Sequence, residues 1–254
     1  MALAALPPSS TALVPFSHAS PFTDLLQLPE RRITVGARTF TIAQAWAPDG
    51  RGGTGSGAAS HMGFGGSIYG SSIALAHHRG VACPSLIRGR RVLELGAGLA
   101  LASLAAAAHG AAAVTAPDGD AAVVARARAA AARNGGAEGA TCSVRQRRWG
   151  EPADAAATGA VDVVVAADVV AAPYARSLPA LAATVGLLLP APGSGVFVLA
   201  YQRRGSEEGA FFEDMAARGW GCTEVPREEL LADFREPQRG AQPLQLFVFS
   251  KGGA

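Results

Sequence analysis

The residues most able to take part in chemistry lie in a glycine-containing turn. The segment reads Glu94-Leu95-Gly96-Ala97-Gly98 and directly follows a short apolar run. Because glycine has no Cβ, the backbone of such a turn can bend sharply and approach a ligand closely. We therefore predict that this turn contacts a ligand, although tight structural turns also use glycine.

The spacing of small residues in the turn argues against a nicotinamide cofactor. A dinucleotide fingerprint places a third small residue three positions after the second glycine, and that position here is Leu101. The small residue comes one position earlier, at Ala100, and the acidic Glu94 stands two positions before Gly96. Both features favour S-adenosylmethionine as the cofactor.

A carboxylate suited to binding a ribose follows at the end of the next predicted strand. Asp118 lies about twenty residues beyond Gly98, where a carboxylate can accept hydrogen bonds from both ribose hydroxyls. The flanking Pro117 and Gly119 also permit a helix N-cap or turn role for Asp118, and Asp120 competes for either role. The spacing alone leaves both roles open for Asp118.

The elements that must position these residues follow the alternation of a parallel α/β fold. The apolar run at 161–167 is what a central parallel strand, buried on both faces, requires. The last two predicted strands have no long apolar helix between them, so the final strand is expected to be antiparallel. We predict a doubly wound, Rossmann-like sheet of seven mostly parallel strands. The predicted strands are 91–95, 112–116, 143–147, 161–167, 195–201, 221–225 and 244–250, and the predicted helices are 68–78, 100–109, 121–133, 178–189 and 210–218.

Three regions are predicted along the chain. Residues 1–30 have the composition of a flexible N-terminal extension. Residues 31–66 combine a small hairpin, indicated by alternating polar and apolar residues at 33–42, with a loop rich in Gly, Ser and Ala at 47–66. Residues 67–254 are expected to form one domain that carries the glycine turn.

Composition and charge exclude several kinds of partner. The formal net charge of +2, from 22 basic and 20 acidic residues, gives no electrostatic footprint for nucleic acid. The three arginines at 145, 147 and 148 are interpreted as a solvated rim. No stretch supplies the roughly 20 strongly apolar residues of a membrane span, because 99–117 is mostly alanine and glycine. We expect neither a nucleic-acid nor a membrane partner.

Cysteine usage and the N-terminal composition bear on the compartment. Cys83, Cys142 and Cys222 are few and far apart, which predicts no disulfide framework, no metal site and a reducing compartment. Residues 1–20 lack acidic groups and are rich in Ala, Ser and Pro, but no arginine precedes Arg31. We expect a cytoplasmic protein, with a chloroplast or other organelle as the alternative.

An ordered set of motifs resembles the methyltransferase-like family 16, whose best-known members are eukaryotic seven-strand protein-lysine methyltransferases. The likeness extends from about residue 66 to residue 251 and implies a methyltransferase domain over 67–254. The motifs are Val92-Leu93-Glu94-Leu95-Gly96-Ala97-Gly98, then Val114-Thr115 before Asp118, then Trp149-Gly150, then Ala167-Asp168-Val169-Val170.

The resemblance implies roles for residues that their patterns alone do not assign. Gly96, Ala97 and Gly98 would cradle the methionine end of the cofactor, and Asp118 its ribose. Trp149, which without the family reads as a core aromatic, would flank the adenine.

Two further roles also come from the resemblance. The backbone around Ala167 would close the pocket. Tyr69 stands where family members carry a tryptophan and could still contact the cofactor.

The catalytic role of Asp168 is a hypothesis from charge. A carboxylate favours the ammonium form of a lysine and does not help to deprotonate it. We therefore expect Asp168 to capture and aim the amine, while the proton of that amine passes to water.

One departure from the family pattern bears on the substrate. After the strand at 161–167 the family has Asp, two aliphatic residues and an aromatic, whereas this chain has Asp168-Val169-Val170-Ala171, with Tyr174 three residues later. The expected function is methylation of a protein lysine. The alternatives are methylation of a small molecule or of another protein side chain, and an inactive binding module. Sequence alone does not decide the oligomeric state.

Overall fold

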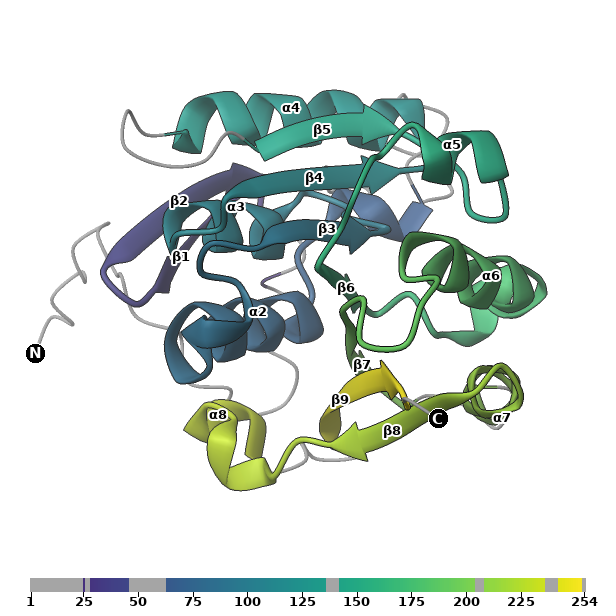
Figure 1. Cartoon of the computed structure of the whole chain (residues 1–254). Coiled ribbons are helices and arrows are strands. Elements are labelled where there is room, and N and C mark those ends of the chain that lie inside the picture. Colours follow the sequence, from purple (N-terminus) through teal and green to yellow (C-terminus); the bar gives the residue numbers. More distant parts are fainter. Residues whose placement is uncertain are drawn as a thin grey trace, which may run out of the picture.

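The computed structural model describes residues 25, 28–45, 63–135, 142–203, 208–235 and 242–252. Most of the predicted N-terminal extension and of the predicted 47–66 loop therefore lies outside the described residues. The described part contains a seven-stranded sheet of order β5-β4-β3-β6-β7-β9-β8 (Figure 1). Its strands are β3 (Arg91–Leu95), β4 (Ala113–Asp118), β5 (Cys142–Gln146), β6 (Val163–Ala167), β7 (Val196–Gln202), β8 (Trp220–Glu224) and β9 (Leu244–Lys251).

The sheet is parallel except at one strand. β3 pairs in parallel with β4 and β6, β4 with β5, and β6 with β7. β9 lies between β7 and β8 and is antiparallel to both. The predicted doubly wound sheet with an antiparallel last strand is thus confirmed. Because the parallel strands point the same way, the segments that follow β3, β4, β5 and β6 meet at one edge of the sheet.

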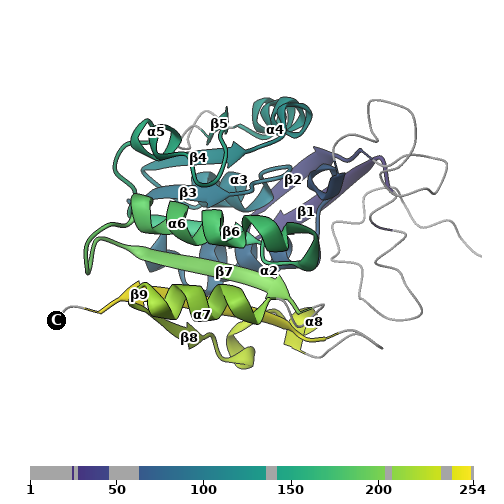
Figure 2. The same ribbon diagram turned by 90° about the vertical axis from the view of Figure 1, so that its right-hand side faces the viewer.

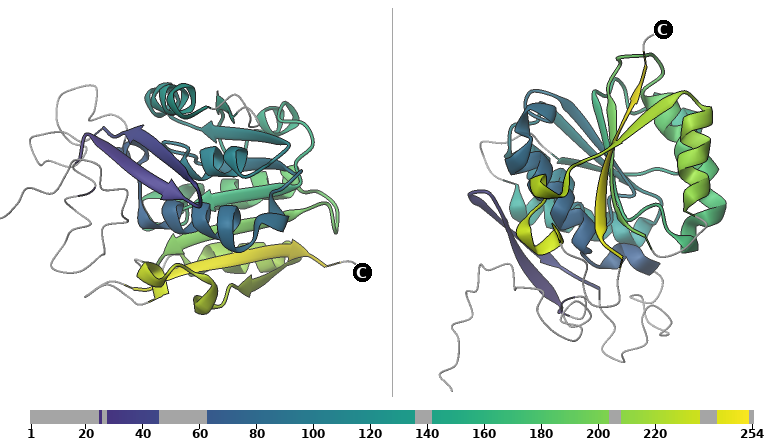
Figure 3. Two further views of the ribbon diagram at one scale, coloured as in Figure 1. Left: turned by 90° about the vertical axis from the view of Figure 1, so that its left-hand side faces the viewer. Right: turned by 90° about the horizontal axis from the view of Figure 1, so that it is seen from below.

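Helices cover both faces of the sheet (Figures 2 and 3). Successive strand residues alternate between two apolar clusters: Val163 and Val165 pack in one, and Val164 and Ala166 in the other. This alternation explains the unbroken apolar runs of the central strands. One face is covered by α2 (Gly70–His77), α3 (Leu101–Ala108) and α4 (Ala121–Asn134), and the other by α5 (Pro152–Ala156), α6 (Leu178–Leu188) and α7 (Gly209–Ala217).

A separate two-stranded hairpin precedes this sheet. β1 (Glu30–Val35) and β2 (Arg38–Ala43) pair antiparallel, with Ile33 opposite Phe40, so the hairpin predicted at 33–42 is confirmed. Its apolar residues belong to the same buried cluster as α2 and α3. Asn134, the last residue of α4, accepts a hydrogen bond from the Thr41 N–H (2.7 Å) and donates one to the Thr41 carbonyl (2.9 Å).

Six short segments complete the described elements. They are the 3₁₀ turns η2 (Gly63–Gly66), η4 (Pro84–Leu86), η5 (Ala172–Ser177) and η6 (Arg227–Glu229), the π-helical turn η3 (His78–Ala82), and α8 (Ala232–Arg235).

Among the described residues, no helix is long and apolar enough to cross a membrane.

Candidate functional site

The glycine turn joins β3 to α3 through three left-handed residues at alternate positions. Gly96 has a φ of 63°, Gly98 a φ of 53° and Ala100 a φ of 62°. Glycine adopts this conformation at no steric cost, whereas for alanine it costs roughly 1–2 kcal/mol. The chain accepts that strain at Ala100 and enters α3 one residue later, so the prediction of a helix from residue 100 is off by one residue.

Backbone and carboxylate contacts fasten the turn to the end of β4. The Ala97 N–H donates to the Pro117 carbonyl (3.0 Å), and the Gly98 N–H donates to Asp118 Oδ2 (3.0 Å). Asp118 Oδ1 accepts a third bond from the Asp120 N–H (3.0 Å). Burial raises the pKa of Asp118 despite these bonds. The turn and the carboxylate predicted to share a ligand are therefore in direct contact.

The start of α4 shows which of Asp118 and Asp120 is the N-cap of this helix. Asp120 Oδ1 accepts hydrogen bonds from the N–H groups of Ala122 (2.7 Å) and Val123 (3.2 Å). Asp120 is therefore the N-cap of α4. Asp118 does not cap this helix, and its carboxylate instead faces the glycine turn.

Glu94 lies inside the interface between β3 and α3. It is only 2% exposed, and its Oε2 accepts hydrogen bonds from both the backbone N–H (2.8 Å) and the hydroxyl (2.5 Å) of Ser103. Burial outweighs these bonds and raises the pKa of Glu94 to about 7. The contacts of Glu94 in the structure thus hold the first turn of α3 against β3, and its predicted contact with a cofactor stays a prediction.

Three other segments crowd against the glycine turn. A Cβ built on Gly96 would lie 2.7 Å from Val169 Cγ1 and 3.1 Å from Trp149 Cζ2. A Cβ built on Gly98 would lie 3.3 Å from the Gly65 carbonyl oxygen. The residues that follow β5 and β6, together with η2, therefore meet the turn at one place, and no side chain fits at Gly96 without displacing them.

Trp149 is held beside the turn by contacts on two sides. The N–H of the next residue, Gly150, donates to Thr184 Oγ1 of α6 (2.8 Å). The ring of Tyr174 in η5 meets the Trp149 ring edge-on, with centroids 6.3 Å apart. Ala171 is buried. Tyr174, which follows Ala171 by three residues, therefore contacts the site through the Trp149 ring.

Asp168 follows β6 in a strained conformation. Its φ of 55° is unusual for a residue other than glycine. Its N–H donates to the Ala200 carbonyl (2.9 Å), and its Oδ1 accepts from the Gln202 N–H (3.2 Å). Ala167, the last residue of β6, pairs with the same Ala200. Asp168 is therefore fixed to β7, and its neighbour Val169 is the residue that touches the glycine turn.

Tyr69 lies at the N-terminal boundary of α2. Its carbonyl accepts a hydrogen bond from Ser72 Oγ (2.9 Å), and its side chain is half-buried. The structure places Tyr69 three residues after η2, which borders Gly98. Its predicted contact with a cofactor stays a prediction.

Sequence analysis missed two residues of this cluster, Val169 and Gly65. The Gly65-Gly66 pair is a signal that could have directed attention to η2, since adjacent glycines permit close backbone approach. Val169 carries no such signal, because an aliphatic residue after a strand is ordinary.

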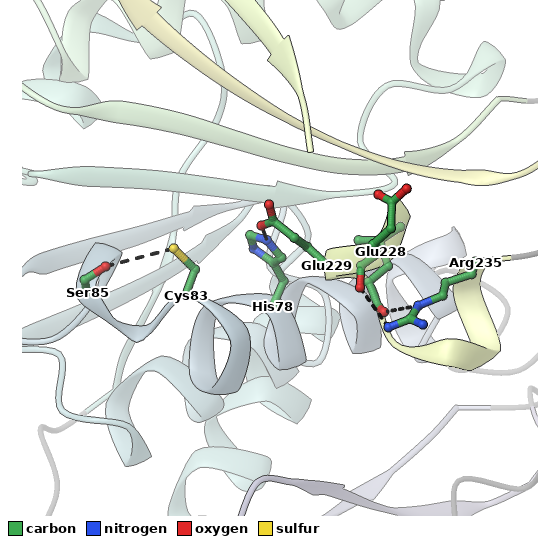
Figure 4. A network of polar contacts seen from close by, with 7 residues as sticks. His78, Cys83, Ser85, Glu228, Glu229 and Arg235 are labelled. Atoms are coloured by element: carbon green, nitrogen blue, oxygen red, sulfur yellow. Dashed lines mark hydrogen bonds and ion pairs between the residues drawn. The ribbon is translucent and has the colours of Figure 1, made fainter. Parts of the chain in front are cut away.

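A second polar cluster lies where α2 continues into η3 (Figure 4). His78 Nε2 is 3.4 Å from Glu229 Oε2, and Arg235 is bonded to the carbonyls of Glu228 (2.7 Å) and Leu230 (2.9 Å). Burial and the neighbouring Arg79 lower the pKa of His78 to about 4. Within the described ranges, no three His, Cys, Asp or Glu residues are grouped so as to hold a metal ion.

Comparisons with known proteins agree with this geometry. The seven-stranded topology is the class I methyltransferase fold. The model of the lysine methyltransferase family matches residues 59–218. The chain therefore belongs to the lysine methyltransferase family. No match was found among curated proteins.

Solved structures resemble the chain in fold. SMU.776, a proposed methyltransferase crystallised with S-adenosylhomocysteine, is 13% identical with a TM-score of 0.56, and the match covers 92% of this chain and 57% of that protein. The chain thus spans little more than half the length of SMU.776. The ribosomal protein L11 methylase of Lactobacillus delbrueckii subsp. bulgaricus is 15% identical with a TM-score of 0.55, with 89% and 100% covered. A TehB-like methyltransferase from Corynebacterium glutamicum is 18% identical with a TM-score of 0.51, with 74% and 90% covered.

Proposed function

We propose that this chain methylates a lysine side chain of a protein, with the cofactor bound at the glycine turn and the lysine amine held by Asp168. The observation that carries the proposal is the position of Asp168. Its backbone is fixed to β7 in a left-handed conformation, and the next residue, Val169, packs against Gly96. The family match supports a lysine acceptor.

The residues at the turn suit S-adenosylmethionine. Gly96 and Gly98 adopt left-handed conformations that let the turn bend sharply, so its backbone can approach a ligand closely. A carboxylate offers about four acceptor positions, and Asp118 uses one on each oxygen, for Gly98 and Asp120. The remaining positions can accept the two ribose hydroxyls, while Trp149 offers a ring for the adenine. When bound, S-adenosylmethionine supplies a methyl group on a positively charged sulfur.

A lysine acceptor must lose a proton before it can react. With a reference pKa near 10.4, neutralising the amine at pH 7 costs about 4.6 kcal/mol. A carboxylate favours the ammonium form and cannot lower this cost. Asp168 therefore serves to capture and aim the amine, and the proton leaves to water. Such positioning is a large part of what a displacement of this kind requires.

The acceptor can be identified with labelled cofactor. Purified protein is incubated with tritiated S-adenosylmethionine and a protein extract, alongside the same extract whose lysines have been blocked by acetylation with acetic anhydride. We expect label in protein from the untreated extract alone, and methyl-lysine after acid hydrolysis. Label in small metabolites, or in another amino acid of both extracts, would contradict the lysine assignment.

The role of Asp168 is tested by a substitution that keeps its backbone. Asn tolerates the left-handed conformation as well as Asp does, so Asp168→Asn should fold normally and bind S-adenosylhomocysteine within about twofold of wild type. The loss of the charge that aims the amine should lower the rate of methyl transfer about 100-fold. A rate close to that of the unmodified protein would exclude this role.

A further inference from the structure

One residue next to the site, Ile68, has both its backbone N–H and its carbonyl bound by buried side chains of the hairpin region. The Ile68 N–H donates to Gln44 Oε1 (2.8 Å), and the Ile68 carbonyl accepts from Arg31 Nη1 (2.8 Å). Arg31 is 8% exposed and Gln44 5%. A third bond runs from the Ala45 N–H to the Gly66 carbonyl (2.8 Å). We call Arg31 and Gln44 the Ile68 clamp.

Ile68 lies between two parts of the candidate site. On its N-terminal side is η2, whose Gly65 carbonyl borders Gly98 at 3.3 Å from a Cβ built there. On its C-terminal side is Tyr69, which is followed by α2. Any displacement of Ile68 must therefore move the backbone that borders the glycine turn, the start of α2, or both.

The hairpin is itself bonded to other parts of the chain, so it can hold Ile68 in a fixed position. Its outer side is joined to α4 by the pair of hydrogen bonds between Thr41 and Asn134. Gln44 Nε2 also donates to the carbonyls of Leu25 (2.9 Å) and Leu28 (2.9 Å), which holds the amide in one orientation. Gln44 is thus anchored at residues 25 and 28, and the hairpin is anchored to α4.

Burial of two long polar side chains needs an explanation, because apolar residues of similar size would stabilise the fold at least as well. Burial lowers the pKa of Arg31 to about 10, which leaves it a cation at neutral pH. The desolvation of these groups is offset by bonds to the backbone N–H and carbonyl of Ile68. Buried polar groups of this kind select one geometry over near alternatives.

We propose that Arg31 and Gln44 are positioning residues for the cofactor site, which hold residues 65–69 against the glycine turn so that the turn is preorganised for the cofactor. The inference rests on the cofactor site of the proposed function and extends it to the hairpin. Without the clamp, residues 65–69 must be ordered when the cofactor binds, and that ordering lowers affinity.

The test compares variants of the Ile68 clamp with a variant of Asn134, which binds the same hairpin at Thr41. Arg31→Met and Gln44→Met remove the bonds to Ile68 and keep apolar bulk, whereas Asn134→Ala removes the bonds to Thr41 and leaves Ile68 untouched. Arg31→Lys is the conservative variant, because its ammonium can still donate to the Ile68 carbonyl. Three quantities are measured for each variant: the Kd of S-adenosylhomocysteine by calorimetry, the melting temperature, and amide hydrogen exchange of the peptide that covers residues 65–69.

We expect the two methionine variants to weaken S-adenosylhomocysteine binding about tenfold and to speed hydrogen exchange at residues 65–69. Arg31→Lys should recover most of the affinity. Asn134→Ala should lower the melting temperature but change Kd by less than about twofold.

Two results would overturn the inference. Wild-type affinity in Arg31→Met and Gln44→Met, despite faster exchange at residues 65–69, would make the clamp structural only. An equal loss of affinity in Asn134→Ala would reduce the effect to general stability. If the folded wild-type protein itself failed to bind S-adenosylhomocysteine, the cofactor site of the proposed function would fail, and the clamp would fail with it.

Discussion

Two buried polar regions of this protein differ in how their groups are satisfied. At the glycine turn, the carboxylates of Glu94 and Asp118 each accept two hydrogen bonds from neighbouring backbone or hydroxyl groups. Where α2 meets η3, the described part of the chain offers no hydrogen-bond partner to His77 Nε2, His78 Nδ1 or the three guanidinium nitrogens of Arg79. The first arrangement fixes the backbone of the turn in one conformation, and the second provides no comparable restraint.

Burial shifts the pKa values of the two regions in opposite directions. It disfavours the charged form of any group, so it raises the pKa of the Glu94 carboxyl to about 7 and lowers the pKa of the His78 imidazole to about 4. Glu94 is therefore a source of instability at high pH, and His78 at low pH. Substitutions at the two positions should separate these effects.

The largest expected effect is at Glu94. Folding raises its pKa from 4.5 to about 7, so between these values the folded state keeps a proton that the unfolded state has released. Stability therefore falls as pH rises through this window, by about 3 kcal/mol, and is constant above it. Glu94→Gln, which still offers an acceptor to Ser103, should lack this fall.

Urea unfolding at pH 4.5 and pH 8 measures the Glu94 effect. The difference in unfolding free energy between wild type and Glu94→Gln should shift in favour of the variant at pH 8. A difference that is the same at both values would show that Glu94 is ionised in the folded protein at neutral pH.

The next effect is at His78, with the opposite sign. Its pKa is lowered from 6.5 to about 4 by burial and by Arg79, and Glu229 opposes the shift. Between these values the unfolded state binds a proton that the folded state does not, so stability falls as pH decreases from about 6.5 toward about 4, by on the order of 2 kcal/mol.

His78→Gln should remove that acid sensitivity. Its unfolding free energy should exceed that of wild type by more at pH 5 than at pH 7.5, measured by urea unfolding. Parallel losses in both proteins would mean that other groups cause the acid sensitivity.

A smaller effect distinguishes crowding from backbone strain at the turn. Gly96→Ala and Gly89→Ala place the same methyl group at similar φ values, 63° and 71°. The methyl at Gly96 would meet Val169 and Trp149, whereas nothing lies within 4 Å of the methyl at Gly89. Calorimetry should show S-adenosylhomocysteine affinity reduced at least about tenfold by Gly96→Ala and unchanged by Gly89→Ala. Equal affinities would indicate that the crowded face of Gly96 is not the ligand side.

The smallest expected effect concerns the aromatic support of Trp149. Edge-on ring contacts contribute about 0.5–1.5 kcal/mol, so Tyr174→Ala should weaken S-adenosylhomocysteine binding about threefold by loosening Trp149. Tyr174→Phe keeps the ring and should bind as wild type does. Titrations of the three proteins, followed by tryptophan fluorescence, give the affinities, and a loss in Tyr174→Phe would instead assign the role to the hydroxyl.

The elements with a strong apolar pattern can be predicted from the sequence. The strand expected at 91–95 has the bounds of β3, and the helices expected at 121–133 and 178–189 each end within one residue of α4 and α6. What the pattern does not predict is the insertion of β9 between β7 and β8, since strand order depends on pairing between distant segments. The short α5 and the 3₁₀ turns carry too few residues for a periodic signal.

The candidate site is predictable to a similar extent. The sequence assigns the glycine turn and Asp118 to the same ligand, so their proximity is expected, but the direct hydrogen bond from Gly98 to Asp118 is not predicted. The burial of Glu94 beneath α3 and the hold of Arg31 and Gln44 on Ile68 are not predicted, because no local sequence pattern encodes which backbone or hydroxyl group a buried polar side chain meets.

The central claim is that the glycine turn and Asp118 bind the cofactor, and a crystal structure of the protein with S-adenosylhomocysteine tests it most directly. The account predicts the ribose hydroxyls within hydrogen-bond distance of the Asp118 carboxylate, the methionine end against Gly96, Ala97 and Gly98, and the adenine beside Trp149. A complex in which the ligand lies elsewhere, with Asp118 bonded only to Gly98 and Asp120, would contradict it.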